Sequence, residues 1–311
     1  MAELYEKPRR LILELSQNCN LNCIMCGYGG HPIDESKFFD ENLLTKIVAE
    51  KGFLSDVKEI RLNGRGESTI NPRFPILINK ISNIFPKAKL SITSNLMFQN
   101  EEIVNIFNEN NIDLIVSVDS ANKDDYESIR KGSNYELLIS RLNKIRNCHI
   151  IFTLQKRNLD QIESVGKFAV EHQFGFILNV IRVDDPFYKT EFNKLLDEKW
   201  DIILHQLKTL HQIIEWDSLF IPDQIWGRKI LDNLATTITN WSFPICPNIR
   251  EELMISYNGL VYPCYMFNPY VLGNIYENSL EEIWNSIKRK EFTRNYRENY
   301  YCQKCEYMIH K

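Results

Sequence analysis

The stretch that decides the fold is an apolar segment followed directly by three cysteines. It reads Leu11-Ile12-Leu13-Glu14-Leu15 and then, after three residues, Cys19-Asn20-Leu21-Asn22-Cys23-Ile24-Met25-Cys26. Cysteine thiolates are the usual protein ligands of iron–sulfur clusters. Three thiolates in a C-x3-C-x2-C run on one loop can hold three irons of a [4Fe–4S] cluster and leave the fourth iron open. An open iron can bind a second molecule and pass it an electron.

Short apolar runs alternate with amphipathic helical stretches over residues 8–183, and six β/α units fit this part of the chain. The alternation is typical of a parallel α/β fold, because each strand needs a crossover, usually a helix, to reach its parallel neighbour. The predicted strands cover residues 11–15, 57–62, 89–93, 114–118, 149–154 and 176–183.

The cysteine spacing directly after a first strand resembles the radical S-adenosylmethionine (SAM) superfamily. The resemblance implies that the six units form a partial (β/α)6 TIM-type barrel and that SAM chelates the open iron. It also implies that reduction of the cluster cleaves SAM to a 5′-deoxyadenosyl radical, which removes a hydrogen atom from a substrate C–H bond. The alternative is a zinc site, but zinc needs four converging ligands, and His31 lies five residues beyond Cys26.

Other positions match the residues with which that family holds SAM. Met25 precedes the third cysteine, where the family places an apolar side chain near the adenine. The run Asn63-Gly64-Arg65-Gly66-Glu67 resembles the family's Gly-Gly-Glu motif, which binds the SAM amino group. Because Arg65 replaces the first glycine, only Gly66 and Glu67 are carried over. The resemblance assigns further SAM contacts after the third and fourth strands to Ser94, Asn95, Ser117, Asp119 and Arg130.

Polar residues at the ends of predicted barrel strands are candidates for the substrate site. Barrel strands are covered on both faces, so a polar residue there needs a reason, and barrel enzymes build their sites at the carboxyl ends of strands. Glu14 is expected to be buried and could orient the substrate or act as a base. Arg182, Asp184 and Asp185 are the other candidates for these catalytic roles. The alternative is that such residues cap loops or satisfy backbone groups.

Four further cysteines lie near the C-terminus. Cys246 is followed by a G-x4-C motif that ends at Cys264, and Cys302 and Cys305 form C-x2-C. This pattern resembles the twitch or SPASM extension of radical SAM enzymes, which binds auxiliary clusters. We expect the shorter twitch form, with one auxiliary [4Fe–4S] cluster that has four cysteine ligands and accepts or relays an electron. A structural zinc site with four cysteine ligands is the alternative.

The sequence divides into three predicted parts. Residues 1–185 form the partial barrel, and residues 244–311 form the small iron–sulfur domain. Residues 186–243 break the β/α rhythm and are expected to be a helical insertion or connector that packs on the barrel, with helices at about 191–214 and 223–239. The remaining cysteine, Cys148, precedes the fifth strand at the barrel end opposite to the chemistry. It is expected to be a buried structural thiol.

Composition excludes several classes of partner. The 311 residues are 44% apolar and 25% charged, which is ordinary for a soluble globular protein. A net charge of −4 gives no basic excess for nucleic acid, and the basic run at 288–297 is predicted to be a solvated helix face. No apolar run approaches the ~18–20 residues of a membrane span, and no signal peptide is recognisable. Cysteines interpreted as metal ligands require a reducing compartment, so we expect a cytoplasmic protein.

The resemblance covers nearly the whole chain and leaves the substrate open. The first hypothesis is redox-coupled oxidation of a small polar metabolite, as in the twitch-bearing aminocyclitol dehydrogenases. The second is modification of a ribosomally made peptide by a thioether, a C–C crosslink or epimerisation. The chain begins almost at its first strand, so no N-terminal leader-peptide domain is expected. An electron donor such as flavodoxin or ferredoxin is implied in either case. A degenerate barrel that only binds or scaffolds is the non-enzymatic alternative.

Overall fold

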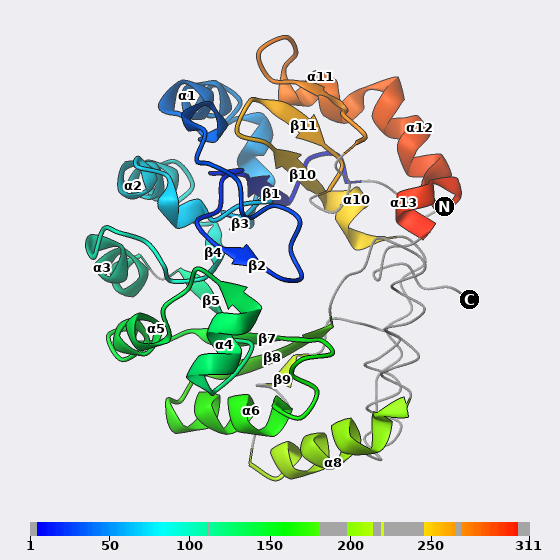
Figure 1. Ribbon diagram of the computed structural model, residues 1–311. Helices are drawn as coiled ribbons and strands as arrows, with labels where there is room; N and C mark the ends of the chain where they lie inside the picture. The colour runs from blue at the N-terminus through cyan, green and yellow to red at the C-terminus, as the bar shows by residue number, and fades with distance from the viewer. Residues whose placement is uncertain are drawn as a thin grey trace.

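The computed structural model describes residues 5–110, 112–180, 198–213, 219–220, 246–264 and 269–303. Within these ranges, ten strands form one sheet in the order β12-β11-β10-β1-β3-β4-β5-β7-β8-β9. Figure 1 shows that this sheet curves into an open arc. The protein therefore has the α/β fold with a mostly parallel, barrel-like sheet that the sequence predicted.

The six predicted strands are all present, and each is hydrogen-bonded in parallel to the next along the chain. The strand predicted at 149–154 has the predicted bounds, the other five differ by one or two residues at one or both of their described ends, and the end predicted at 181–183 lies outside the described residues. Their bounds are β1 (Arg10–Leu13), β3 (Glu59–Arg61), β4 (Lys89–Ser94), β5 (Asp113–Ser117), β7 (His149–Leu154) and β8 (Gly175–Val180).

Helices connect these strands, and α1, α2, α3, α5 and α6 line the outer side of the arc (Figure 1). Several begin where a side chain accepts a hydrogen bond from an otherwise unpaired backbone N–H. Asp40 accepts from Leu43 N at the start of α1, and Asn134 accepts from Leu137 N at the start of α5, both at 2.8 Å. The bounds are α1 (Glu41–Ala49), α2 (Phe74–Ile84), α3 (Glu102–Glu109), α4 (Lys123–Ile129), α5 (Tyr135–Leu142) and α6 (Ile162–Glu171).

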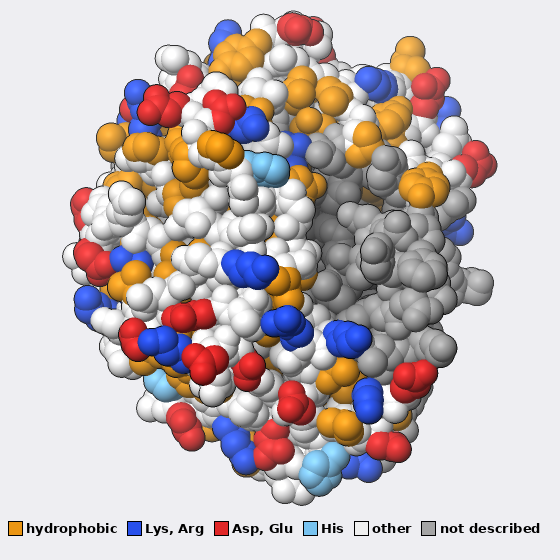
Figure 2. Space-filling model, viewed as in Figure 1, with side chains coloured by type: hydrophobic (Ala, Val, Ile, Leu, Met, Phe, Trp, Pro, Cys, Tyr) orange, Lys and Arg blue, Asp and Glu red, His pale blue; other side chains and the backbone are white. Residues whose placement is uncertain are grey.

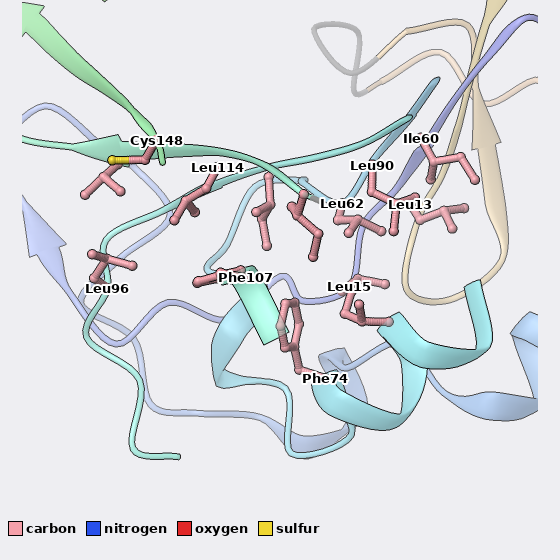
Figure 3. Packing of buried hydrophobic residues seen from close by; sticks show 14 of the residues in the cluster. Leu13, Leu15, Ile60, Leu62, Phe74, Leu90, Leu96, Phe107, Leu114 and Cys148 are labelled. Carbon is pink, nitrogen blue, oxygen red and sulfur yellow. The ribbon is translucent and has the colours of Figure 1, made fainter. Parts of the chain in front are cut away.

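The hydrophobic core lies between the strands and the outer helices, as Figure 3 shows in close-up. Leu13, Ile60 and Leu90 come from three neighbouring strands and are at most 4% exposed. Phe74 and Phe107 bring the apolar faces of α2 and α3 together, with ring centroids 6.1 Å apart in an edge-to-face arrangement. Cys148 lies in the same core, directly before β7, which confirms the prediction of a buried thiol.

The segment predicted as an insertion continues the β/α rhythm where it is described. Helix α8 (Trp200–His211) packs on α6, and a methyl group at Gly166 would come within 2.3 Å of Leu210. After it, β9 (Leu219–Phe220) pairs in parallel with β8. The described part of this segment thus packs on the barrel through α8 and adds β9 to the sheet, and its assignment as an insertion or connector stays a prediction. A two-residue edge strand is too short to be recognised by its composition. The helix predicted at 223–239 lies outside the described residues.

The C-terminal part joins the same sheet on the other side of β1. Its strand β10 (Glu252–Ile255) pairs in parallel with β1, while β11 (Leu260–Tyr262) and β12 (Gly273–Asn274) follow as antiparallel strands. The described helices of this part are α10 (Pro247–Glu251), α11 (Leu280–Asn285), α12 (Ile287–Asn295) and α13 (Tyr300–Gln303). Because β10 pairs with β1, the hairpin that leads to Cys264 begins beside the strand that precedes the first cysteine run.

Four short 3₁₀ helices and a two-stranded ribbon complete the described structure. The ribbon pairs β2 (Asn22–Cys23) with β6 (Arg130–Lys131) in antiparallel fashion. The 3₁₀ helices are η1 (Glu35–Lys37), η2 (Phe53–Asp56), η3 (Ser68–Ile70) and η5 (Tyr296–Glu298).

The basic run at 288–297 differs from its prediction at one residue. Lys288, Lys290, Arg294 and Arg297 are exposed, but Arg289 is only 2% exposed. Its guanidinium lies 3.3 Å from the ring centroid of Trp284 and donates to the backbone oxygens of 249 and 250. Burial lowers the pKa of Arg289 to about 9. The prediction of a solvated face is therefore wrong for Arg289, because tertiary packing buried one member of the run.

The described surface carries mixed charges. Figure 2 shows acidic and basic side chains interspersed over one face of the molecule. None of the helices within the described ranges is both long enough and apolar enough to cross a membrane.

Trp284 tests whether the C-terminal part and the barrel form one folding unit. Its side chain is 1% exposed, and its Nε1 donates to the backbone oxygen of Tyr5 at 3.1 Å, 279 residues away in the chain. Trp284→Ala is expected to lower the free energy of unfolding by about 3–5 kcal/mol, measured by anaerobic urea denaturation. Ile287→Ala is the control, since Ile287 is 75% exposed and its loss is expected to cost less than about 0.5 kcal/mol. Equal effects of the two changes would contradict this packing.

Candidate active site and cluster sites

The first cysteine run lies at the carboxyl ends of the barrel strands. After β1 ends at Leu13, the chain turns, and Cys23 enters the ribbon opposite Arg130. A backbone bond from Ile24 N to Ile129 O at 3.0 Å continues this pairing. Cys23 is buried, Cys19 is half-buried and Cys26 is exposed. The ribbon therefore holds the middle of the loop and leaves one thiol facing outward.

The three thiols of this loop are neighbours. Burial raises the pKa of Cys19 to about 12; a backbone hydrogen bond lowers it, whereas Glu67, Cys23 and Cys26 raise it. Thiolates here need a positive partner, which iron supplies, since metal binding deprotonates a coordinating thiol. Within the described ranges, no three Cys, His, Asp or Glu side chains stand where they could hold a single metal ion. In a [4Fe–4S] cluster each thiolate binds a different iron, so the chemistry and the shared loop of these cysteines fit such a cluster.

The loop after β3 packs directly on the cysteine loop. Glu67 N donates to Asn18 O at 2.8 Å. A methyl group at Gly66 would lie 2.2 Å from Asn18 O and 2.6 Å from the backbone carbon of Gln17, so only glycine allows this approach. The sequence predicted Gly66 and Glu67 as SAM contacts. The structure adds that Gly66 is required by the close approach of two backbones.

Glu67 is the centre of a buried polar network. Its Oε1 accepts from Thr69 Oγ1 at 2.6 Å and from Ser94 Oγ at 3.0 Å, and its Oε2 accepts from Asn95 N at 2.8 Å. Asn95 Nδ2 in turn donates to Asn20 Oδ1 at 3.0 Å, within the cysteine run. Burial raises the pKa of Glu67 more than these hydrogen bonds lower it. The predicted residues Glu67, Ser94 and Asn95 are thus brought together beside the cysteine loop.

A second buried line of contacts runs from Asp119 through Arg130 to Cys23. Arg130 Nε lies 2.8 Å from Asp119 Oδ2, and Arg130 Nη1 lies 3.9 Å from Cys23 Sγ. Burial opposes the charge of Arg130, but Asp119 and Cys23 outweigh it and raise the pKa of this guanidinium. A fixed positive charge therefore stands beside a candidate cluster ligand. Asp119 also accepts from Thr153 N, so much of its carboxylate is committed within the protein.

Buried polar atoms without partners border this line. In the described part of the chain, Tyr126 Oη and Gln155 Nε2 have no hydrogen-bond partner. Tyr126 follows β5 in the chain and lies near Arg130, Asp119 and Cys23, all of which influence its pKa. Buried polar groups are normally paired, so such orphans suit a site that receives a polar ligand. Met25 is half-buried against the core and Ser117 is buried at the end of β5, and their roles as SAM contacts stay predictions.

Glu14 is buried, as predicted, and its partner is Arg65. The carboxylate accepts from Arg65 Nε at 2.8 Å, from Arg65 Nη2 at 2.6 Å and from Arg65 N at 2.9 Å. Both oxygens of this candidate base are therefore engaged by a guanidinium. Arg65 was the position at which the sequence departed from the family motif. That departure and the need of Glu14 for a partner were the two signals that could have identified the pair.

Three of the four C-terminal cysteines share one small apolar cluster. Cys246, Cys264 and Cys302 pack with Ile249, Phe292 and Tyr296, apart from the main core. This arrangement suits a shared auxiliary site. The fourth predicted ligand, Cys305, lies outside the described residues, as do the catalytic candidates Arg182 and Asp184.

Comparisons with known proteins identify the family. The family model of the radical SAM superfamily matches residues 13–169, about half of the chain, and the protein belongs to this superfamily. A second model, the SPASM iron–sulfur cluster-binding domain, matches residues 246–306. The superfamily implies a [4Fe–4S] cluster and SAM, and the SPASM domain implies auxiliary iron–sulfur clusters. The resemblance found in the sequence is thereby confirmed, together with SAM, its [4Fe–4S] cluster and auxiliary iron–sulfur binding, while the shorter twitch form with one auxiliary cluster stays a prediction.

The proteins to which this chain is similar differ in what they mature or bind. The chain is 26% identical over 306 residues to a cysteine-type anaerobic sulfatase-maturating enzyme of Clostridium novyi, covering 91% of this chain and 80% of that enzyme. It is similar in fold to SuiB of Streptococcus suis bound to SAM, with a TM-score of 0.68, 16% identity and coverage of 98% and 72%. SuiB has also been solved with its precursor peptide SuiA. BtrN in complex with SAM and 2-DOIA gives a TM-score of 0.52, 17% identity and coverage of 95% and 88%.

The close approach at Gly66 gives a test of the first cluster site. Gly66→Ala is expected to push the cysteine loop away and to lower the iron content from about eight to about four per chain, measured after anaerobic reconstitution. Gly52→Ala is the control, because nothing lies within 4 Å of a methyl group there. Full iron content in Gly66→Ala would show that the loop does not depend on this contact.

Proposed function

We propose that this radical SAM enzyme oxidises its substrate by two electrons. The observation that carries the proposal is the arrangement of two cysteine sets on one sheet, joined where β10 pairs with β1. Bound at the first set, the cluster and SAM supply reductive cleavage of SAM and abstraction of a hydrogen atom. The second set offers a place for the electron that the substrate must then lose.

The proposed oxidation balances in atoms and electrons. With one external electron, a bound cluster and SAM would supply the chemistry that removes one hydrogen atom from the substrate, with methionine and 5′-deoxyadenosine as coproducts. The substrate would then lose a proton to a base of this chain and an electron to the auxiliary site at the second cysteine set. Since Glu14 is engaged by Arg65, we assign the base to Asp184, which follows β8 in the chain, and a substrate contact to Arg182. The electron donor we propose is flavodoxin or ferredoxin in the reducing cytoplasm.

Residues of this chain would hold the cofactors in place. Cys19, Cys23 and Cys26 would bind the first cluster, and Arg130 would offset its negative charge beside Cys23. Glu67 and the network around it would receive the SAM amino group, because carboxylate and carbonyl oxygens accept from an ammonium. Cys246, Cys264, Cys302 and Cys305 would bind one auxiliary cluster.

For the substrate, we favour a peptide or a protein segment. The curated relative named above is a sulfatase-maturating enzyme, so its substrate is a protein, and it aligns with 91% of this chain. SuiB bound to its precursor peptide SuiA matches the fold over 98% of this chain, with a TM-score of 0.67. Because of these two similarities, we favour a peptide substrate over the small metabolite, which was the first hypothesis from sequence.

A small polar metabolite is the second candidate. BtrN, solved with 2-DOIA, supports it, although that fold matches less closely than SuiB does. The two candidates differ in which molecule loses two hydrogens. A short precursor-peptide gene beside the gene for this chain would supply the first peptide to test by mass spectrometry, next to aminocyclitols. A product of unchanged mass would contradict the oxidation with either substrate.

The cysteine assignments predict which thiols the chemistry needs. Cys23→Ala is expected to reduce 5′-deoxyadenosine formation with dithionite and SAM by at least about 100-fold, because an essential cluster ligand is lost. Cys148→Ala removes a thiol that lies in the hydrophobic core, and it is expected to keep most of the activity. Chromatographic measurement of 5′-deoxyadenosine decides this. Loss in both variants, or in neither, would contradict the assignment of these cysteines.

A further inference from the structure

Four segments of the chain meet around one half-buried guanidinium. Arg65 comes from the loop after β3, Glu14 from the end of β1, and Gln17 from the start of the cysteine loop. Tyr257 and Tyr262 come from the hairpin of β10 and β11 in the C-terminal part. We call these five residues the Arg65 junction. Two of its residues are close in sequence to a cysteine of each set: Gln17 is two residues before Cys19, and Tyr262 is two residues before Cys264.

Glu14 and Arg65, the pair at the centre of the Arg65 junction, are tightly packed and joined by several hydrogen bonds. Glu14 is fully buried, the Arg65 side chain is 11% exposed, and three N–H groups of Arg65 point to the carboxylate at 2.6–2.9 Å. The chain approaches so closely that a methyl group at Gly64 would lie 2.2 Å from Glu14 Cγ. Glu14 N also donates to Ile255 O at 3.0 Å, so the residue extends the pairing of β1 with β10.

Gln17 and the tyrosines connect this pair to the other two segments. With the Gln17 amide oriented as its neighbours require, its oxygen accepts from Arg65 Nη1 at 3.1 Å and its nitrogen donates to Tyr257 Oη at 3.2 Å. The Arg65 guanidinium also lies 5.9 Å from the ring centroid of Tyr262, a cation–π contact. One side chain thereby bridges the barrel, the first cysteine loop and the auxiliary hairpin.

The contacts of Arg65 argue against a direct role in chemistry. Its Nε and Nη2 are used by Glu14, and its Nη1 is used by Gln17. A buried ion pair is weak grounds for a stabilising role, since a well-packed apolar pair often stabilises as much. What such a pair provides is a fixed geometry between the groups that it joins.

We infer that Arg65 is a positioning residue that fixes the auxiliary-cluster hairpin against the loop of Cys19, Cys23 and Cys26. Functional groups must be held within about 0.5 Å of their working geometry by supporting residues, and the junction supplies that support between two cluster sites. The inference concerns the joint itself and does not depend on the substrate or on the oxidation proposed above.

The opposite end of the same joint provides a matched control. At the amino end of β1, Arg10 pairs with Glu59 at 2.9 Å, with Glu251 at 3.1 Å and with Glu252 at 3.4 Å. Arg10 therefore also joins the barrel to the C-terminal part through β1 and β10, but at the end away from the cysteine loop. If Arg65 only stabilised the joint, replacing Arg65 and replacing Arg10 would have the same effect on the interaction between the two clusters.

The test compares Arg65→Met, Arg65→Lys and Arg10→Met as reconstituted full-length protein without substrate. The measurement is the electron paramagnetic resonance spectrum of the dithionite-reduced protein, in which two nearby reduced clusters broaden and split each other's signals. Arg65→Met is expected to change this interaction and to keep about eight irons per chain. Arg65→Lys is expected to restore part of it, and Arg10→Met to leave it unchanged.

Two results would overturn the inference. One is an unchanged cluster interaction in Arg65→Met, and the other is an equal change in Arg10→Met. If Arg65→Met does not fold or load iron, Tyr257→Phe takes its place, because it removes only the hydroxyl that Gln17 contacts. An unchanged interaction in Tyr257→Phe and Arg65→Lys together would then reject the inference. Failure of the oxidation proposal would leave all these spectra as expected, so the two failures are distinguishable.

Discussion

The pairing of β1 with strands on both of its sides is the constraint on which the site depends. β1 bonds in parallel to β3 on one side and to β10 on the other. Because parallel strands place their carboxyl ends at one edge of a sheet, the loops that leave β1 and β3 and the hairpin that leaves β10 must converge there. The first loop carries Cys19, Cys23 and Cys26, and the hairpin leads to Cys264. The backbone ladder thus brings the first cysteine loop and the hairpin to one edge of the sheet, where the Arg65 junction joins them.

Buried charge at this edge is neutralised within the protein. Glu14 meets Arg65 and Asp119 meets Arg130, so two carboxylates and two guanidiniums that would be costly alone are paired. In the part of the chain that the structure describes, Glu67 has no such cation among its hydrogen-bond partners and is instead supported by neutral donors from Thr69, Ser94 and Asn95. This difference suits Glu67 to receive a cationic group of a ligand. Glycine stands at positions 64 and 66 because neighbouring segments leave no space for a side chain there.

Sequence patterns correctly predicted the parts of the fold that depend on residues close together in the chain. All six barrel strands were recognised because short runs rich in apolar residues alternate with helical patterns, and the two cysteine sets were recognised from their spacing and their resemblance to the family's motifs. The places where prediction failed depend on contacts between distant residues. Arg289 looks like one member of a solvated basic run, and only its packing on Trp284 buries it. The strands β9 and β10 and the Glu14–Arg65 pair, 51 residues apart in the chain, likewise follow from tertiary assembly. The predicted domain limits at 185, 186–243 and 244 stay predictions, although the sheet runs continuously through β10.

The central claim is that one sheet carries two separate iron–sulfur sites. The measurement that tests it most directly is iron, sulfide and zinc content after anaerobic reconstitution, on the native chain and on two variants. One variant replaces Cys19, Cys23 and Cys26 by alanine, and the other replaces Cys246, Cys264 and Cys302. The account predicts about eight irons in the native chain and about four in each variant. Four irons with one tightly bound zinc in the native chain, and zinc lost only from the second variant, would contradict it.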